Sequence, residues 1–182
     1  GVMPMDWGTT KVMAKTVTNN IEIPADGLKA GTVYGDASLV SCEVLADMPA
    51  KADSAAEVDG VKYDFMVQGA ANPKPNKGDI PTEGAAFKIT AAVDSSITFV
   101  TKGAAKTYHF VDADKTNDVT GTEVPTGSLT FEMTAGKTYY FYLDGSKACV
   151  YGISYKYEQA SDYQKEVVAI GADGFKAGET YG

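Results

Sequence analysis

The sequence predicts an all-β fold, an antiparallel β-sandwich of about eight strands with the connections of a jelly roll. Three observations favour it. Short runs of alternating or apolar residues are bounded by clusters of Gly, Pro, Asp and Ser. No segment shows the apolar period of a convincing amphipathic helix. The composition, 44% apolar and 10% aromatic, is ordinary for a globular domain with a buried core.

The alternating runs predict the strands individually. Phe87, Ile89 and Ala91 alternate with Lys88 and Thr90, which gives the predicted strand one buried face and one wet face. Runs of this kind predict strands at residues 38–45, 61–68, 85–93, 96–102, 107–112, 128–133, 138–143 and 148–157. The alanine-bearing residues 48–57 are compatible with one or two turns of helix.

The most pronounced runs, at residues 138–143 and 148–157, flank the dipeptide Asp144-Gly145. An Asp-Gly pair between two strand-like runs is a strong hairpin signal because both residues tolerate positive φ. We therefore expect a long antiparallel hairpin here. Both faces of this hairpin carry apolar residues, so a second sheet has to pack on it.

Charge limits the classes of partner. The formal net charge is −8, and all 16 cationic residues are lysine. A chain without arginine lacks the bidentate group that reads guanine and phosphate, and an acidic surface repels polyanions. We therefore expect no nucleic-acid partner. The chain also lacks an apolar run of about 18 residues, so we expect no membrane insertion.

Two cysteines, Cys42 and Cys149, lie on predicted strands near the two ends of one module. The first and last strands of a sandwich often run side by side, which would permit a disulfide. Buried free thiols are the alternative, and both interpretations stay open at this point.

Residues 24–35 and 171–182 share a pattern. Ala, Asp, Gly, Lys, Ala, Gly, Tyr and Gly recur in the same order, and Asp26 and Asp173 are 147 residues apart. A period of this length suits tandem domains. We expect a linker-like segment at 1–22, a β-sandwich module at 23–158, a linker at 159–170 and the start of a truncated second repeat at 171–182. Neighbouring repeats of the same protein are then expected partners.

Signatures of catalysis are missing from the sequence. It contains no GxSxG, HExxH, P-loop or GxGxxG pattern. His109 is the single histidine and lies in a predicted strand without a nearby second ligand, so we interpret it as a strand residue on the solvent face. Two carboxylates could meet in space, but none has a recognisable setting for glycoside hydrolysis. We expect no enzymatic activity.

The acidic loop after residue 111 offers oxygen ligands at calcium-like spacing, namely Asp112, Asp114, Asn117 and Asp118. It departs from the EF-hand pattern because Thr116 takes the third ligand position and the required glycine is absent. A plain hairpin turn and a calcium site are the two interpretations, and no other cofactor is expected.

Tyrosines are the more suggestive signal. Tyr140 and Tyr142 share a face of their predicted strand, where phenol rings can stack on sugars and hydroxyl groups can bond to sugar hydroxyls. Cross-strand packing is the alternative. Together with Tyr108 and Lys106, they are the candidate glycan-binding residues.

The order of these elements resembles a known group of binding modules. The similarity rests on residues 84–89 (GAAFKI), 96–100 (SITFV), 107–112 (TYHFVD), 135–141 (AGKTYYF) and 150–153 (VYGI). They resemble the jelly-roll carbohydrate-binding modules and lectin-like domains of secreted polysaccharide-degrading proteins of gut and rumen bacteria. The module attached to bacterial pectate lyases is the nearest likeness.

This resemblance implies a non-catalytic, extracellular or cell-surface module that binds a plant polysaccharide. Pectin-binding relatives are expected to present cations to galacturonate, whereas this chain is acidic and lacks arginine. We therefore expect a neutral glycan, such as starch or a hemicellulose, rather than pectin. The alternative is a structural spacer or adhesin repeat of a bacterial surface protein that binds no glycan.

Overall fold

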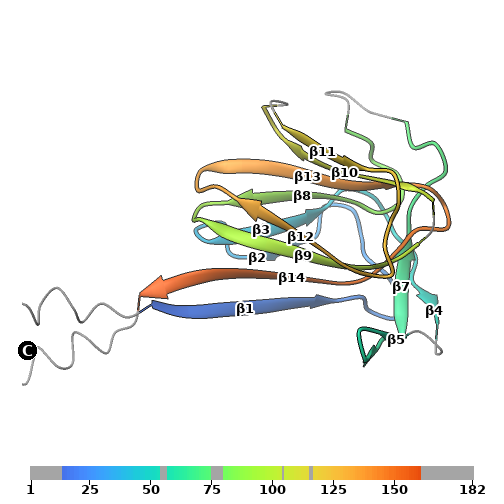
Figure 1. Cartoon of the computed structure of the whole chain (residues 1–182), viewed down its shortest axis with the longest axis horizontal. Coiled ribbons are helices and arrows are strands. Elements are labelled where there is room, and N and C mark those ends of the chain that lie inside the picture. The colour runs from blue at the N-terminus through green and yellow to red at the C-terminus, as the bar shows by residue number, and fades with distance from the viewer. Residues whose placement is uncertain (1–13, 54–56, 75–79, 104, 115–116, 161–182) are drawn as a thin grey trace, which may run out of the picture. The chain divides into compact units, whose positions relative to one another are not determined.

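A computed structural model gives the fold and describes residues 14–53, 57–74, 80–103, 105–114 and 117–160 (Figure 1). These residues form strands, turns and loops, and among them there is no helix long and apolar enough to cross a membrane. The chain divides into two units. Residues 18–157 make up the sandwich, and the described part of the other unit is residues 14–17 and 158–160.

The described residues contain fourteen strands. They are β1 (Ala14–Glu22), β2 (Val33–Gly35), β3 (Val40–Val44), β4 (Lys51–Ala52), β5 (Glu57–Val58), β6 (Val61–Lys62), β7 (Phe65–Gln68), β8 (Ala86–Ala91), β9 (Ser95–Lys102), β10 (Thr107–Asp112), β11 (Asp118–Gly121), β12 (Gly127–Met133), β13 (Lys137–Asp144) and β14 (Cys149–Ala160).

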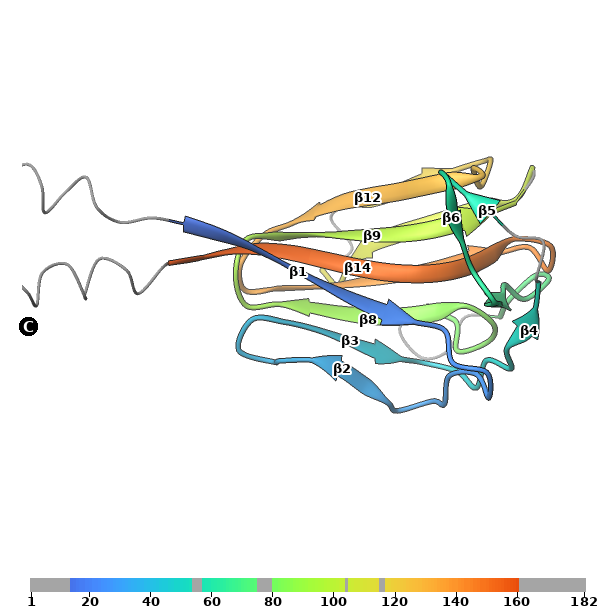
Figure 2. The ribbon, with the colours of Figure 1, turned by 90° about the horizontal axis from the view of Figure 1, so that it is seen from below.

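Two six-stranded sheets pack face to face, and the predicted antiparallel β-sandwich is confirmed. Sheet I has the order β12-β9-β14-β7-β4, and β1 also pairs with β14. Sheet II has the order β11-β10-β13-β8-β3-β2. The short strands β5 and β6 form a separate two-stranded hairpin, which lies across the outer face of sheet I in Figure 2.

The core between the sheets is aromatic. Phe99 of sheet I stacks on Phe141 of sheet II with ring centroids 3.7 Å apart, and Phe131 stacks on Phe110 at 4.2 Å. Both stacks join residues of opposite sheets, so they fix the distance between the layers. The predicted alternation of β8 is confirmed because Phe87, Ile89 and Ala91 are fully buried.

The predicted hairpin at residues 138–157 is wrong, although both strands exist. β13 pairs with β8 and β10 in sheet II, whereas β14 pairs with β7 and β9 in sheet I. The Asp144-Gly145 connection therefore carries the chain from one sheet to the other. From β7 to β14, consecutive strands change sheets at every step except between β10 and β11.

The strand count exceeds the predicted eight because short edge strands escaped prediction. β2, β4, β5 and β11 have two to four residues each, too few for an alternating pattern. The predicted strand at 61–68 divides into β6 and β7. Residues 48–53 carry strand β4 and no helix, so the helical interpretation of that stretch is wrong.

β1 occupies residues 14–22 of the segment predicted to be linker-like and pairs with β14. The predicted second repeat at 171–182 lies outside the described residues, as does most of the predicted linker. In the first copy, Gly27, Gly31 and Gly35 have φ values of 83°, 89° and 93°. Positive φ favours glycine, so the three glycines that recur in residues 171–182 stand at positions where the backbone requires glycine.

Cys42 and Cys149 are free and buried. Cys42 belongs to β3 in sheet II and Cys149 to β14 in sheet I, so the disulfide interpretation is wrong and the buried-thiol alternative is confirmed. Complete burial raises the pKa of the Cys42 thiol to about 12.

Candidate functional site

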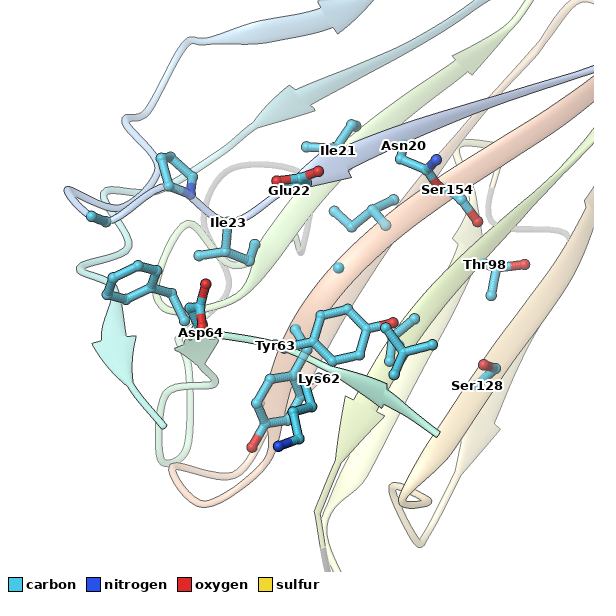
Figure 3. A pocket seen from close by; sticks show the side chains of 18 residues that line it. Asn20, Ile21, Glu22, Ile23, Lys62, Tyr63, Asp64, Thr98, Ser128 and Ser154 are labelled. Atoms are coloured by element: carbon cyan, nitrogen blue, oxygen red, sulfur yellow. The ribbon is translucent and has the colours of Figure 1, made fainter. Parts of the chain in front are cut away.

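A pocket of about 740 Å³ opens on the outer face of sheet I (Figure 3). Its floor comes from β14, β9 and β12. One wall is the end of β1 and residues 23–25, and another is β6 with residues 63–65. The size falls within the range of ordinary ligand sites, about 300–1,000 Å³.

The β5–β6 hairpin is held on the sheet by a small apolar cluster of its own. Val58 of the hairpin is 2% exposed and packs with Met66, Cys149 and Tyr151 of sheet I. Tyr63 and Val100 pack against this cluster from the pocket side. Because apolar burial anchors it, the hairpin makes a fixed wall of the pocket.

Tyr63 is the aromatic side chain that stands in the middle of the pocket in Figure 3. Its ring lies 5.7 Å from the ring of Tyr151, tilted by 45°. The Tyr151 hydroxyl donates a 2.7 Å hydrogen bond to the Asp53 carboxylate, which fixes the supporting ring. Partial burial, with the Asp59 carboxylate nearby, raises the pKa of Tyr63 and keeps its hydroxyl a neutral donor and acceptor.

Gly152 lies beneath this ring and lets it approach the floor closely. A Cβ atom at residue 152 would lie 3.5 Å from Tyr63 Cε1. The pairing of β14 with β9 shifts between Val150 and Gly152. This irregularity places two consecutive residues, Tyr151 and Gly152, toward the outer face of sheet I.

The rest of the floor consists of short side chains with hydroxyl groups. Ser154 pairs in register with Thr98, and Gly152 pairs with Val100, which pairs in turn with Ser128. Figure 3 shows Thr98, Ser128 and Ser154 on one side of Tyr63. Hydroxyls of this kind donate and accept hydrogen bonds without charge.

Charged groups stand at the walls rather than on the floor. Glu22 and Asp64 contribute carboxylates and Lys62 an ammonium group, and all three side chains are exposed. The lining therefore combines an aromatic ring, neutral hydroxyls and an excess of negative charge.

Tyr140 and Tyr142, two of the predicted glycan-binding residues, share the outer face of sheet II, away from this pocket. Tyr142 stacks on its cross-strand partner His109 with centroids 4.4 Å apart and planes 11° apart. Thr120 Oγ1 lies 3.2 Å from His109 Nδ1 and donates to Asp118 Oδ1 at 3.0 Å. One face of the Tyr142 ring is thus covered by the imidazole.

Tyr108 and Lys106, the other two predicted residues, do not join that face. Tyr108 follows the opposite alternation of β10, and its ring lies 6.0 Å from Phe131 of sheet I. A Cβ atom at Gly121 would overlap the Tyr108 ring. Lys106 lies with its aliphatic stem against Gly145. The structure brings Tyr140 and Tyr142 together and places Tyr108 elsewhere.

The predicted calcium ligands have other partners. Asp112 is buried and accepts a 2.8 Å bond from the Lys137 ammonium group, which also lies 3.9 Å from Asp114. Asp118 instead faces His109 and Thr120. No three His, Cys, Asp or Glu side chains of the described residues form a group suited to a metal ion. The backbone carbonyl of Asn117 accepts a hydrogen bond from the Asp112 amide, as in a turn. Calcium binding stays a prediction.

Sequence reasoning missed the pocket for two reasons. The pattern at residues 61–68 predicts a single strand, whereas Tyr63 lies between β6 of the outer hairpin and β7 of sheet I. Strict alternation along 148–157 put Tyr151 on the same face as Ile153, whereas the irregularity at Gly152 separates them. The one usable signal was a lone glycine inside a strand-like run, which often marks a bulge or a close approach.

Comparison with protein-family models finds no match, and comparison with curated proteins finds none either. Among solved structures, a GH26-CBM35 β-(1,4)-mannanase of Podospora anserina aligns at 15% identity and a TM-score of 0.36, over 80% of this chain. CapF with an inhibitor aligns at 10% identity and a TM-score of 0.26, over 64% of this chain. The chain spans 28% and 32% of those proteins.

Proposed function

We propose that this chain is a non-catalytic carbohydrate-binding module of a secreted or cell-surface multimodular bacterial protein. Its ligand is a plant polysaccharide held in the pocket on the outer face of sheet I. The pectate-lyase-type binding modules that the sequence resembles are expected to have this architecture and role. The alternative, a spacer or adhesin repeat, would have no use for such a pocket.

The observation that carries the proposal is the Tyr63 ring in the pocket, beside a floor of short side chains. A sugar ring has an apolar face that an aromatic side chain can cover, and hydroxyls around its rim that need hydrogen-bond partners. The floor supplies such partners through Thr98, Ser128 and Ser154. The pocket therefore offers both kinds of contact within one site.

Charge favours a neutral glycan such as starch or a hemicellulose. Glu22 and Asp64 line the pocket against a single cation, Lys62, and the chain contains no arginine. A uronate in this pocket would meet like charges without the bidentate partner that carboxylates favour. Neutral hydroxyl groups meet no such repulsion.

The same carboxylates are unsuited to hydrolysis. A glycosidase uses a general acid whose carboxyl group is set in apolar surroundings, facing a second carboxylate across the scissile bond. Glu22 and Asp64 are both exposed. His109 lies on the other sheet, stacked on Tyr142. Binding without turnover is the function that this arrangement supports best.

The test is retention on insoluble starch, xylan, xyloglucan and pectin. Tyr63→Ala should abolish retention on a neutral glycan. Tyr142→Ala, which removes a tyrosine from the outer face of sheet II, is the matched control and should be retained as well as the wild type. Loss with Tyr142→Ala alone would move the site to sheet II. Wild-type retention on pectin alone would overturn the neutral-glycan proposal, and no retention at all would favour the spacer or adhesin function.

A further inference from the structure

The pocket extends across four neighbouring strands. Ser128, Thr98, Ser154 and Asn20 line it from β12, β9, β14 and β1, which is also the order of these strands in sheet I. At a strand spacing of about 4.8 Å, the pocket floor spans roughly 14 Å from the first strand to the last. Figure 3 shows the four side chains as a series along the sheet.

The β5–β6 hairpin crosses these strands and forms one long wall of the pocket, with Tyr63, Tyr151 and Phe65 on its side (Figure 2). Its turn reaches β12, because a Cβ atom at Gly127 would lie 3.9 Å from Asp59 Oδ2. The lining from β9 and β12 consists of Thr98, Val100 and Ser128, and none of these reaches far above the sheet. The pocket floor is therefore continuous alongside the hairpin toward β12, and no bulky lining residue of those two strands divides it.

We propose that the pocket holds an internal segment of a polysaccharide chain rather than a single sugar or a chain end. The inference rests on the proposed function. Each sugar ring of an extended chain is about as long as the strand spacing, so roughly three rings span the floor, one for each step between strands. One ring packs near Tyr63, and the others lie over the hydroxyl-bearing floor.

Binding should therefore depend on ligand length. With soluble oligosaccharides of the retained neutral glycan, calorimetry should show at least a tenfold rise in affinity from the disaccharide to the tetrasaccharide and little gain beyond it. Reduction of the terminal sugar should leave the affinity of the hexasaccharide unchanged. Equal affinity for disaccharide and hexasaccharide, or loss of binding on reduction, would overturn the proposal.

A variant at the β12 end of the floor separates this proposal from the proposed function. Ser128→Phe places a bulky side chain at the β12 end of the pocket, and Ser128 is exposed, so the fold should persist. It should weaken hexasaccharide binding several-fold and leave disaccharide binding unchanged. Glu132→Phe, on the same face of β12 but outside the pocket lining, is the matched control. If both variants bind the hexasaccharide like the wild type, the extended site is refuted while glycan binding stands. If the wild type binds no oligosaccharide, the extended site and the proposed glycan-binding function are both refuted.

Discussion

The ring of Tyr63 lies close to the backbone of Gly152, so that a Cβ atom at residue 152 would lie 3.5 Å from Tyr63 Cε1. This is an ordinary van der Waals contact, and Gly152 has no positive φ. The floor can therefore accept a methyl group without strain. Such a methyl group would stand on the pocket floor beside the edge of the ring, where a ligand in contact with Tyr63 would meet it.

Gly152→Ala should leave stability within about 0.5 kcal/mol of the wild type and lower glycan affinity. Gly121→Ala is the contrasting variant because its Cβ would overlap the Tyr108 ring, and we expect it to cost about 1–3 kcal/mol. Urea unfolding measures both. A Gly152→Ala protein that binds glycan as tightly as the wild type would show that the floor beneath Tyr63 is not part of the site.

Val58 anchors the hairpin that forms a wall of the pocket. Val58→Ala should therefore weaken glycan binding by loosening this wall, although Val58 does not line the pocket itself. Removing two methyl groups from a side chain that is 2% exposed should cost about 1–3 kcal/mol. Val33→Ala, at a residue 57% exposed, is the control and should be neutral. Glycan affinity and hydrogen exchange at residues 57–63 provide the readouts. Unchanged exchange there would mean that the cluster does not anchor the hairpin.

Lys137 neutralises the buried Asp112 carboxylate in the loop whose sequence is compatible with a calcium site. The hydrogen bond to Asp112, with the charge of that carboxylate, raises the pKa of Lys137. Lys137→Met should lower the urea midpoint more than Lys156→Met, which alters an exposed lysine of β14.

Calcium should leave the melting temperature of the wild type unchanged, because the Lys137 ammonium group already occupies Asp112 and lies 3.9 Å from Asp114. A differential scan with and without calcium decides this. A clear rise in the melting temperature with calcium would support the site predicted from the loop sequence.

Alkaline pH should destabilise the sandwich, and part of this loss of stability should come from ionisation of the Cys42 thiol. The folded-state pKa of Cys42 is raised from 9.0 to about 12. The folded protein then keeps a proton that the unfolded chain has lost, so this stabilisation is complete below pH 9.0 and declines as pH rises toward 12. In urea titrations over this range, Cys42→Ala should lose stability less steeply than the wild type. Parallel slopes would refute the assignment.

The repeat hypothesis predicts that residues 171–182 can replace residues 24–35. Gly27, Gly31 and Gly35 need positive φ, and glycine recurs at each corresponding position. The one exchanged side chain that is deeply buried is Leu28, which becomes phenylalanine, so we expect a cost of about 1–3 kcal/mol. The same chimera with alanine in place of the glycines at positions 27, 31 and 35 should not fold. If both chimeras fold equally well, the shared pattern has no backbone basis.

The sequence was sufficient to predict the fold class and most long strands because their alternation is local. β8 and β13 have alternating faces that follow directly from their residue order. Which strands pair was beyond reach, since Asp144-Gly145 carries a hairpin signal and yet joins two sheets. Pairing is decided by packing, here by stacks such as Phe99 on Phe141, and not by the turn alone.

The pocket was harder to predict than the core because it depends on an exception to alternation. The shift in pairing at Gly152 brings Tyr151 to the outer face of sheet I, where the hairpin containing Val58 covers it. Tyr63 then projects over the floor. Sequence reasoning found the more regular tyrosines, Tyr140 and Tyr142, on the other sheet.

The most direct test of glycan binding in this pocket is an amide-shift titration of isotope-labelled protein with a soluble neutral oligosaccharide. The shifts should cluster at Tyr63, Thr98 and Gly152, and the amide signals of His109 and Tyr142 should stay in place. Shifts confined to β10 and β13 would assign the site to sheet II. No shifts with any neutral oligosaccharide would contradict the central claim that this pocket binds glycan.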